Sequence, residues 1–412
     1  MSLNLEQRKA VEKLSRLKAG ALFMGMGSGK TKVACDLIRH KLDCIDAVIW
    51  IAPAALVNSQ KYLGEVKRWS RGFFKKISFF SIEGISMSDS KYMQMRNLAA
   101  SMKNFCVVDE SIFIKNIHAL RTRRLVCDYS LFDFRLILNG TPVTKSLLDL
   151  YSQITFLSPN ILKMTERQFA DNFLVYFFDG VDQFPWRRWS KPANVEALIE
   201  IIRPYIFNSK FDSSCKIKII NKTFQLNIEE SRNYSRFKDA FLRGKLYVCF
   251  FTVAQKFQMA YTTTCSQKYH AAVKLVEEIL ERGEKVIIFV KYISEALSLR
   301  ESTGGLLYTG KRKDDLARFE GDENVLICTY GSVGLNLQCA NNLIFYSQTF
   351  DFKEKEQAKY RIYRIGQQRS VNIYNLWVDT KLEEIIRKNL SKMGNLLRDI
   401  ERVISAKEAR KL

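Results

Sequence analysis

The segment Gly25-Met26-Gly27-Ser28-Gly29-Lys30-Thr31 has the residue types and spacing of a phosphate-binding loop. It follows the apolar run ALFM, which fits a strand, and precedes KVACDLIRHKL, which fits a helix. Glycines let backbone N–H groups turn toward phosphate oxygens, and the N-terminus of the next helix adds its positive dipole end. Lys30 would reach the β- and γ-phosphates of a nucleotide, and Thr31 would ligate Mg²⁺. Met24 replaces the first glycine of the strict pattern, and the alternative is a glycine-rich turn before an unrelated Lys-Thr pair.

Two acidic residues, Asp109 and Glu110, close a second apolar run further along the chain, VVDES. Parallel strands end at the edge of the sheet where ligands bind, so both side chains would face a ligand there. Asp109 is placed to hold Mg²⁺ through water, and Glu110 to orient and deprotonate an attacking water. Acidic residues often close strands without any catalytic role, so the pair gains its meaning from the phosphate loop upstream.

A third set of residues, Gln357, Arg361 and Arg364, lies in the late segment QAKYRIYRIGQ. If this segment is helical, the three side chains share one face. A planar guanidinium suits the charge that spreads over the γ-phosphoryl oxygens during transfer. The alternative is a basic helix that faces solvent or the phosphates of DNA.

Continuous apolar runs predict the strands that position these residues. Such runs are typical of parallel sheets covered by helices on both faces, so an α/β fold with two lobes is expected. The predicted strands are ALFMGM, 47–53, 105–110 and 134–142 in the first lobe, and 285–290, 324–330, 341–347 and 371–377 in the second.

The sequence predicts that the chain divides into three regions. A first lobe with a helical protrusion is expected at 1–208, a linker or helical bridge at 209–262, and a second lobe at 263–412. Between the lobes, VEALIEIIRPYIF is predicted to be helical and KIKIINKTFQL to be a strand of the bridge. The amphipathic pattern of KLEEIIRKNLSKMGNLLRDIERVI predicts a C-terminal bracing helix.

The charge balance favours a polyanionic partner. Lys and Arg number 65 against 43 Asp and Glu, a formal net charge of +22. Nucleic acid is the leading partner, a generally basic surface is the alternative, and a membrane surface is a weaker one. Nine cysteines without a CxxC pair and three histidines argue against a zinc site and favour free thiols in a reducing compartment. No signal peptide or membrane span is evident, so an intracellular protein is expected.

Several motifs along the chain resemble those of one family. Gln7 in LEQRKAVEKL resembles an adenine-reading glutamine, and GMGSGKT, WIAPAALVNSQKYLGEVKRW and VVDES resemble motifs I, Ia and II. The runs IKN at 114–116 and LNGTP at 138–142 resemble the next conserved elements. GLNL at 334–337 and QAKYRIYRIGQ are similar to motifs V and VI. Together they resemble the Swi/Snf-type DNA translocases of helicase superfamily 2, without accessory domains, rather than DEAD-box RNA helicases.

This resemblance implies two RecA-like lobes that bind ATP and Mg²⁺ in the cleft between them. Arg361 and Arg364 would be arginine fingers, and Gln357 and Gly334 would line the cleft. Two departures concern the coupling of ATP to DNA. Motif II reads Asp-Glu-Ser instead of Asp-Glu-x-His, and Tyr330-Gly331-Ser332 stands where the family more often has Arg-Ala-Gly.

The expected function is a DNA-stimulated ATPase that translocates on double-stranded DNA as a monomer, with single-stranded or forked DNA as other possible tracks. Two alternatives stay open, a strand-separating DNA or RNA helicase and an ATP-gated nucleic-acid clamp or scaffold that does not travel. The three arginines of the expected DNA contacts could equally form a solvated helix face. The expected contacts are Asn58, Lys61, Arg121, Arg123, Arg124 and Thr141.

Overall fold

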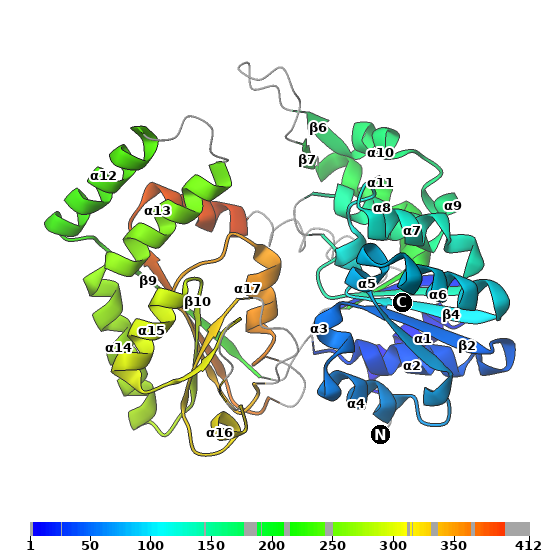
Figure 1. The fold of residues 1–412 in the computed structure, drawn as a ribbon, viewed down its shortest axis with the longest axis horizontal. Coiled ribbons are helices and arrows are strands. Elements are labelled where there is room, and N and C mark those ends of the chain that lie inside the picture. The colour runs from blue at the N-terminus through cyan, green and yellow to red at the C-terminus, as the bar shows by residue number, and fades with distance from the viewer. Residues whose placement is uncertain are drawn as a thin grey trace. The chain divides into compact units, whose positions relative to one another are not determined.

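The computed structural model describes two compact units, the first with the described residues up to 209 and the second with those from 215 to 391 (Figure 1). Each unit contains one six-stranded sheet with parallel strands, so the predicted α/β fold with two parallel-sheet lobes is confirmed. The described residues are 3–25, 27–143, 146–176, 188–190, 192–209, 215–243, 250–310, 314, 316–330, 337–363 and 367–391.

The first sheet contains the four strands predicted for the first lobe. They are β1 (Ala19–Met24), β2 (Ala47–Ala52), β4 (Asn104–Asp109) and β5 (Phe134–Asn139). Every residue of β2 and β4 is buried, which explains why their sequences are continuously apolar. Two strands that were not predicted, β3 (Ile77–Ser81) and β8 (Ile206–Ser209), complete the order β3-β2-β4-β5-β1-β8.

Helices cover both faces of the first sheet (Figure 1). Side chains of α1, α2 and α4 share a core with alternate residues of the central strands, among them Trp50, which is fully buried. The helices of this part of the unit are α1 (Leu5–Leu14), α2 (Lys30–Arg39), α3 (Ala54–Val57), α4 (Gln60–Trp69), α5 (Ile82–Met87), α6 (Asp89–Ser101) and α7 (Leu120–Cys127).

A helical layer follows β5 in the first unit. It comprises α8 (Leu148–Leu157), α9 (Pro159–Leu162), α10 (Glu166–Phe173) and α11 (Pro192–Ile202), with the antiparallel strands β6 (Leu174–Tyr176) and β7 (Arg188–Ser190). The prediction of a continuous helix through VEALIEIIRPYIF was wrong. Helix α11 ends at Ile202, a 3-10 turn that includes Pro204 follows, and the chain continues as β8, whose backbone pairs with β1.

The second sheet contains the four later predicted strands, β10 (Val286–Val290), β12 (Val325–Thr329), β13 (Asn342–Phe345) and β14 (Val371–Val378). The short strand β11 (Leu306–Tyr308) was not predicted. Strand β9 (Ile217–Phe224) was predicted as part of the bridge, and it is the edge strand of this sheet, paired along its whole length with β14. The order is β11-β12-β10-β13-β14-β9.

Among the described residues of the second unit, three long helices lie between β9 and β10. The described helices of this unit are α12 (Ile228–Arg243), α13 (Phe250–Thr264), α14 (Ser266–Glu281), α15 (Ile293–Thr303), α16 (Leu316–Glu320) and α17 (Phe352–Lys359). Residues 381–391, the start of the predicted bracing helix, are also helical, and the rest of that prediction lies outside the described residues. The predicted domain limits, 1–208, 209–262 and 263–412, stay predictions.

Two further observations apply to the part of the chain that the structure describes. None of its helices is both long and apolar enough to cross a membrane. Within the same residues, no group of three or more His, Cys, Asp or Glu side chains could hold a metal ion.

Candidate nucleotide-binding site

The phosphate loop connects β1 to α2 and depends on its glycines. Gly27 has φ 77° and Gly29 φ 84°, in the left-handed region that favours glycine. A Cβ added at Gly29 would also lie 2.5 Å from Nε2 of Gln7. The residue types of the loop therefore match its backbone, as the sequence predicts. Met26 lies outside the described residues.

Lys30 begins α2 and directs its ammonium group at the loop. Its Nζ donates to the carbonyl oxygens of Met24 at 3.0 Å and Gly25 at 3.3 Å. The first N–H groups of a helix have no partner within the helix, so the start of α2 offers donors to an anion. The loop, the start of α2 and the Lys30 ammonium group thus provide donors of the kind that bind the phosphates of a nucleoside triphosphate.

Gln7 supports the loop from helix α1. Its Oε1 accepts from the backbone N–H of Asn4 at 3.1 Å, which closes a capping box at the start of the helix. Its Nε2 donates to the backbone carbonyl of Ser28 at 2.8 Å, and the side chain is buried. The structure thus brings Gln7 to the phosphate loop, and its adenine-reading role stays a prediction.

The strand register places Asp109 at the carboxyl ends of the strands, where the phosphate loop also lies. Asp109 pairs with Leu138 of β5, and Leu138 pairs with Leu22 of β1, two residues before the strand ends. Burial, and then the neighbouring Glu110, raise the pKa of the Asp109 carboxyl to about 6. The Tyr62 hydroxyl, the Lys30 charge and the Glu110 N–H act in the opposite direction on this pKa.

The backbone of Glu110, the residue after Asp109, is strained. Its φ of 54° and ψ of 51° are left-handed, which costs a residue with a Cβ about 1–3 kcal/mol. Such strain clusters at functional sites, where surrounding contacts hold the residue in place. The conformation ends β4 abruptly and starts the 3-10 turn Ser111–Ile114.

Ser111, the departure in motif II, belongs to a buried polar network. Its hydroxyl donates to Oε1 of Gln153 at 2.7 Å and accepts from Nδ2 of Asn139 at 3.4 Å. Gln153 also donates to the carbonyl of Pro142 at 2.9 Å, and the Thr141 N–H donates to Oδ1 of Asn139 at 3.1 Å. Motifs II and III are therefore joined through a glutamine of α8 that the sequence analysis missed.

The expected DNA contacts occupy different environments. Asn58, Lys61 and Arg123 are exposed, whereas the side chain of Thr141 is buried. Arg121 donates to the carbonyl of Phe113 at 2.8 Å. Arg124 donates to the carbonyl of Ile85 at 2.6 Å, pairs with Asp89, and lies over the Tyr92 ring. Contact with DNA stays a prediction for all six residues.

The residues expected from the second lobe are only partly described. Helix α17 ends at Lys359, so it includes Gln357, and Arg361 lies in the following turn instead of on the same helix. Arg361 is buried, and its backbone carbonyl accepts from the N–H of Leu337 at 3.2 Å. Gly334 and Arg364 lie outside the described residues.

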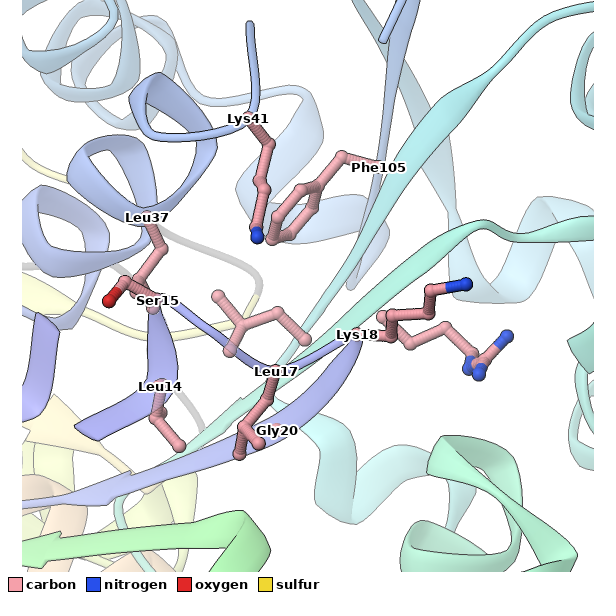
Figure 2. A pocket seen from close by; sticks show the side chains of 10 residues that line it. Leu14, Ser15, Leu17, Lys18, Gly20, Leu37, Lys41 and Phe105 are labelled. Atoms are coloured by element: carbon pink, nitrogen blue, oxygen red, sulfur yellow. The ribbon is translucent and has the colours of Figure 1, made fainter. Parts of the chain in front are cut away.

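The first unit also has a small hollow, which lies near the amino end of β1, away from the phosphate loop (Figure 2). It is lined by Lys18 and Gly20 at the start of β1, together with Leu14, Lys41 and Phe105, whereas the phosphate loop follows the other end of β1. Its volume of about 10 Å³ has room for one water molecule at most, so it cannot hold a nucleotide.

Two family models match parts of this chain. Residues 74–230 match the SNF2-related domain, and residues 267–366 match the helicase conserved C-terminal domain. The chain carries an SNF2-related domain followed by a helicase C-terminal domain. The first match begins after the phosphate loop and includes Asp109 and Glu110, and the second includes Gln357.

Relatives of this SNF2-related chain are longer proteins. An uncharacterized ATP-dependent helicase of Mycoplasma genitalium is 23% identical over 89% of the chain and 38% of its own length. Human chromodomain-helicase-DNA-binding protein 1 is 24% identical over 82% of the chain and 22% of its own length. The chain spans less than half the length of the curated relatives that it matches.

One similar solved structure is the Sulfolobus solfataricus SWI2/SNF2 ATPase core in complex with dsDNA. It has 18% sequence identity and a TM-score of 0.44, and the match covers 97% of this chain and 93% of that chain.

Proposed function

We propose that this SNF2-related ATPase hydrolyses ATP in response to double-stranded DNA and uses the energy to translocate along the duplex. One observation carries the catalytic half of the proposal. The phosphate loop and the Asp109–Glu110 pair lie at the same edge of one parallel sheet, where ligands of such sheets bind. The DNA half is supported by the net charge of +22.

Residues of the first unit would bind and activate the nucleotide. Lys30 and the N–H groups of the loop and α2 would bind the phosphates, and Glu110 would orient and deprotonate the attacking water. Thr31 and Asp109 would hold Mg²⁺, for which hydroxyl and carboxylate oxygens are suitable ligands. When bound, Mg²⁺ would offset the negative charge of the β- and γ-phosphates.

Residues of the second unit would act in the transition state. We propose Arg361 and Arg364 as the donors to the transferring phosphoryl group, and Gln357 and Gly334 as further residues of the nucleotide site. An arginine in this role contributes about 10³–10⁵ in turnover.

DNA would bind through the exposed members of the predicted contact set, Asn58, Lys61 and Arg123. One relative is named as a helicase-DNA-binding protein, which supports DNA as the partner. Several relatives are named ATP-dependent helicases, so strand separation is the second candidate function. We propose a monomeric protein that acts inside the cell.

Side-by-side ATPase rates on duplex DNA, single-stranded DNA, forks and RNA test the choice of track. We expect low turnover alone and the largest increase with duplex DNA. The increase should shrink steeply as salt rises, because phosphate contacts release counterions. Equal stimulation by RNA and duplex DNA, or a response that does not change with salt, would contradict the proposal.

A further inference from the structure

The hydroxyl group of Tyr62 lies between an indole and a carboxylate. Nε1 of Trp50 donates to the Tyr62 oxygen at 2.9 Å, and the hydroxyl donates to Oδ2 of Asp109 at 2.5 Å. An indole N–H can only donate, so the single proton of the Tyr62 hydroxyl is committed to Asp109. The direction of donation is therefore fixed from Trp50 through Tyr62 to Asp109.

The two oxygens of Asp109 are held by different groups. Oδ1 accepts from the backbone N–H of Glu110 at 2.9 Å, and Oδ2 accepts from Tyr62. A hydrogen bond to an ionised acceptor is roughly twice as strong as one between neutral groups. Tyr62 therefore sets the rotation of the carboxylate that we place beside Mg²⁺, although Tyr62 itself would touch neither Mg²⁺ nor the nucleotide.

The sheet explains why a residue of α4 reaches this carboxylate. Side chains alternate between the faces of a strand, so Phe105, Val107 and Asp109 point to one face of β4. Trp50 of the neighbouring strand shares a core with Phe105, Val107 and Val66 of α4. Asp109 thus points toward the face of the sheet that α4 covers.

Tyr62 lies in the first turn of α4, next to two exposed residues of the predicted DNA contact set. The backbone N–H of Tyr62 donates to the Ser59 hydroxyl at 3.4 Å, which caps the start of the helix. Asn58 precedes this cap, and Lys61 precedes Tyr62. A force from DNA on the start of α4 would therefore act directly on the hydroxyl that holds Asp109.

We propose that Tyr62 is a positioning residue that couples DNA at the start of α4 to the carboxylate of Asp109. The inference rests on the proposed function, because it takes Asn58 and Lys61 as DNA contacts and Asp109 as a Mg²⁺ ligand. It adds a path from the start of α4 through the Tyr62 side chain to Asp109. Coupling between two ligands is reciprocal, so binding measurements report it without turnover.

The test compares Tyr62→Phe with a matched control, Tyr92→Phe. The Tyr92 hydroxyl also donates to a carboxylate of the first unit, Oδ2 of Asp128 at 2.8 Å, but from α6 and outside the nucleotide site. A non-hydrolysable ATP analogue is titrated into the full chain with Mg²⁺ or with EDTA, each with and without duplex DNA. Thermal unfolding of both variants shows that they are folded.

In the wild type, duplex DNA should change the affinity for the Mg²⁺-nucleotide by about 5–150-fold. Tyr62→Phe should bring this factor close to one and should weaken Mg²⁺-dependent binding about tenfold, as expected for one lost hydrogen bond to a charged group. Binding in EDTA and the affinity for DNA alone should not change. Tyr92→Phe should match the wild type in all four conditions.

Three results would overturn the inference. If Tyr62→Phe keeps the wild-type DNA factor, the inference fails and the proposed function stands. If Tyr62→Phe and Tyr92→Phe both lose the effect of DNA on nucleotide affinity to the same extent, the hydrogen bond from Tyr62 to Asp109 contributes to folding alone, and the inference also fails. If the wild type shows no effect of DNA on nucleotide affinity, there is no coupling for Tyr62 to carry and the inference fails, whereas the ATPase rates on duplex DNA decide the proposed function.

Discussion

Replacement of Glu110 by Gln is expected to lower the rate of ATP hydrolysis by about 10²–10⁴-fold, the usual contribution of a general base. An amide cannot take a proton from the attacking water, whereas its size and hydrogen-bonding reach match those of the carboxylate. Glutamine also keeps the same Cβ, so the left-handed backbone at φ 54° is no more strained than before. Single-turnover hydrolysis of bound ATP measures the effect directly.

ATP binding should survive in Glu110→Gln, because Lys30 and the glycines of the loop are untouched. Glu12→Gln, an exposed position on α1, is the matched control and should turn over ATP at the wild-type rate. Normal hydrolysis in Glu110→Gln would show that another group is the base and would remove the catalytic assignment of the Asp109–Glu110 pair.

Replacement of Lys30 by Ala should weaken ATP binding about 10–150-fold, since hydrogen bonds to charged groups contribute about 1.5–3 kcal/mol. Turnover at saturating ATP should fall by about 10²–10³-fold, as when a donor to developing negative charge is removed. The truncation also removes the bonds from Nζ to the carbonyls of Met24 and Gly25, at 3.0 Å and 3.3 Å. Fluorescent-nucleotide titration and steady-state kinetics separate the two losses.

Lys32→Ala is the control for this prediction. Lys32 lies two residues further along the same helix, and its Nζ lies over the Trp69 ring, 4.9 Å from the centroid. Its removal should leave ATP binding within about twofold, because this half-buried cation–π contact contributes to local packing and not to the phosphates. Equal losses in the two variants would mean that Lys30 has no special role at the phosphates.

The strands that the sequence predicts are those buried on both faces, because burial leaves a continuous apolar run. All residues of β2 and β4 are buried, and both strands were predicted. The edge strand β3 is mostly half-buried, and β8 is four residues long after a proline turn. Neither strand therefore has a distinct apolar pattern in the sequence. Strand β9 was predicted as a strand, but only its pairing with β14 assigns it to the second sheet.

The candidate site, like the strands, was predicted only in part. The phosphate loop and the acidic pair were predicted because each is a short local pattern with its own chemistry. Tyr62 and Gln153 were missed, because their partners Asp109 and Ser111 lie 47 and 42 residues away in the chain. Nothing in the local sequence marks such a contact. The left-handed backbone of Glu110 was also unpredictable, since that conformation is unusual for a glutamate.

Displacement of a third strand from triplex DNA tests the proposed translocation most directly. The duplex stays paired in this assay, so the third strand is released only when a protein travels along the duplex. We expect the wild type to release the strand with ATP and Mg²⁺, and Glu110→Gln to bind the DNA without releasing it. Duplex-stimulated ATPase activity with no strand release would contradict translocation and would leave a nucleotide-gated DNA clamp.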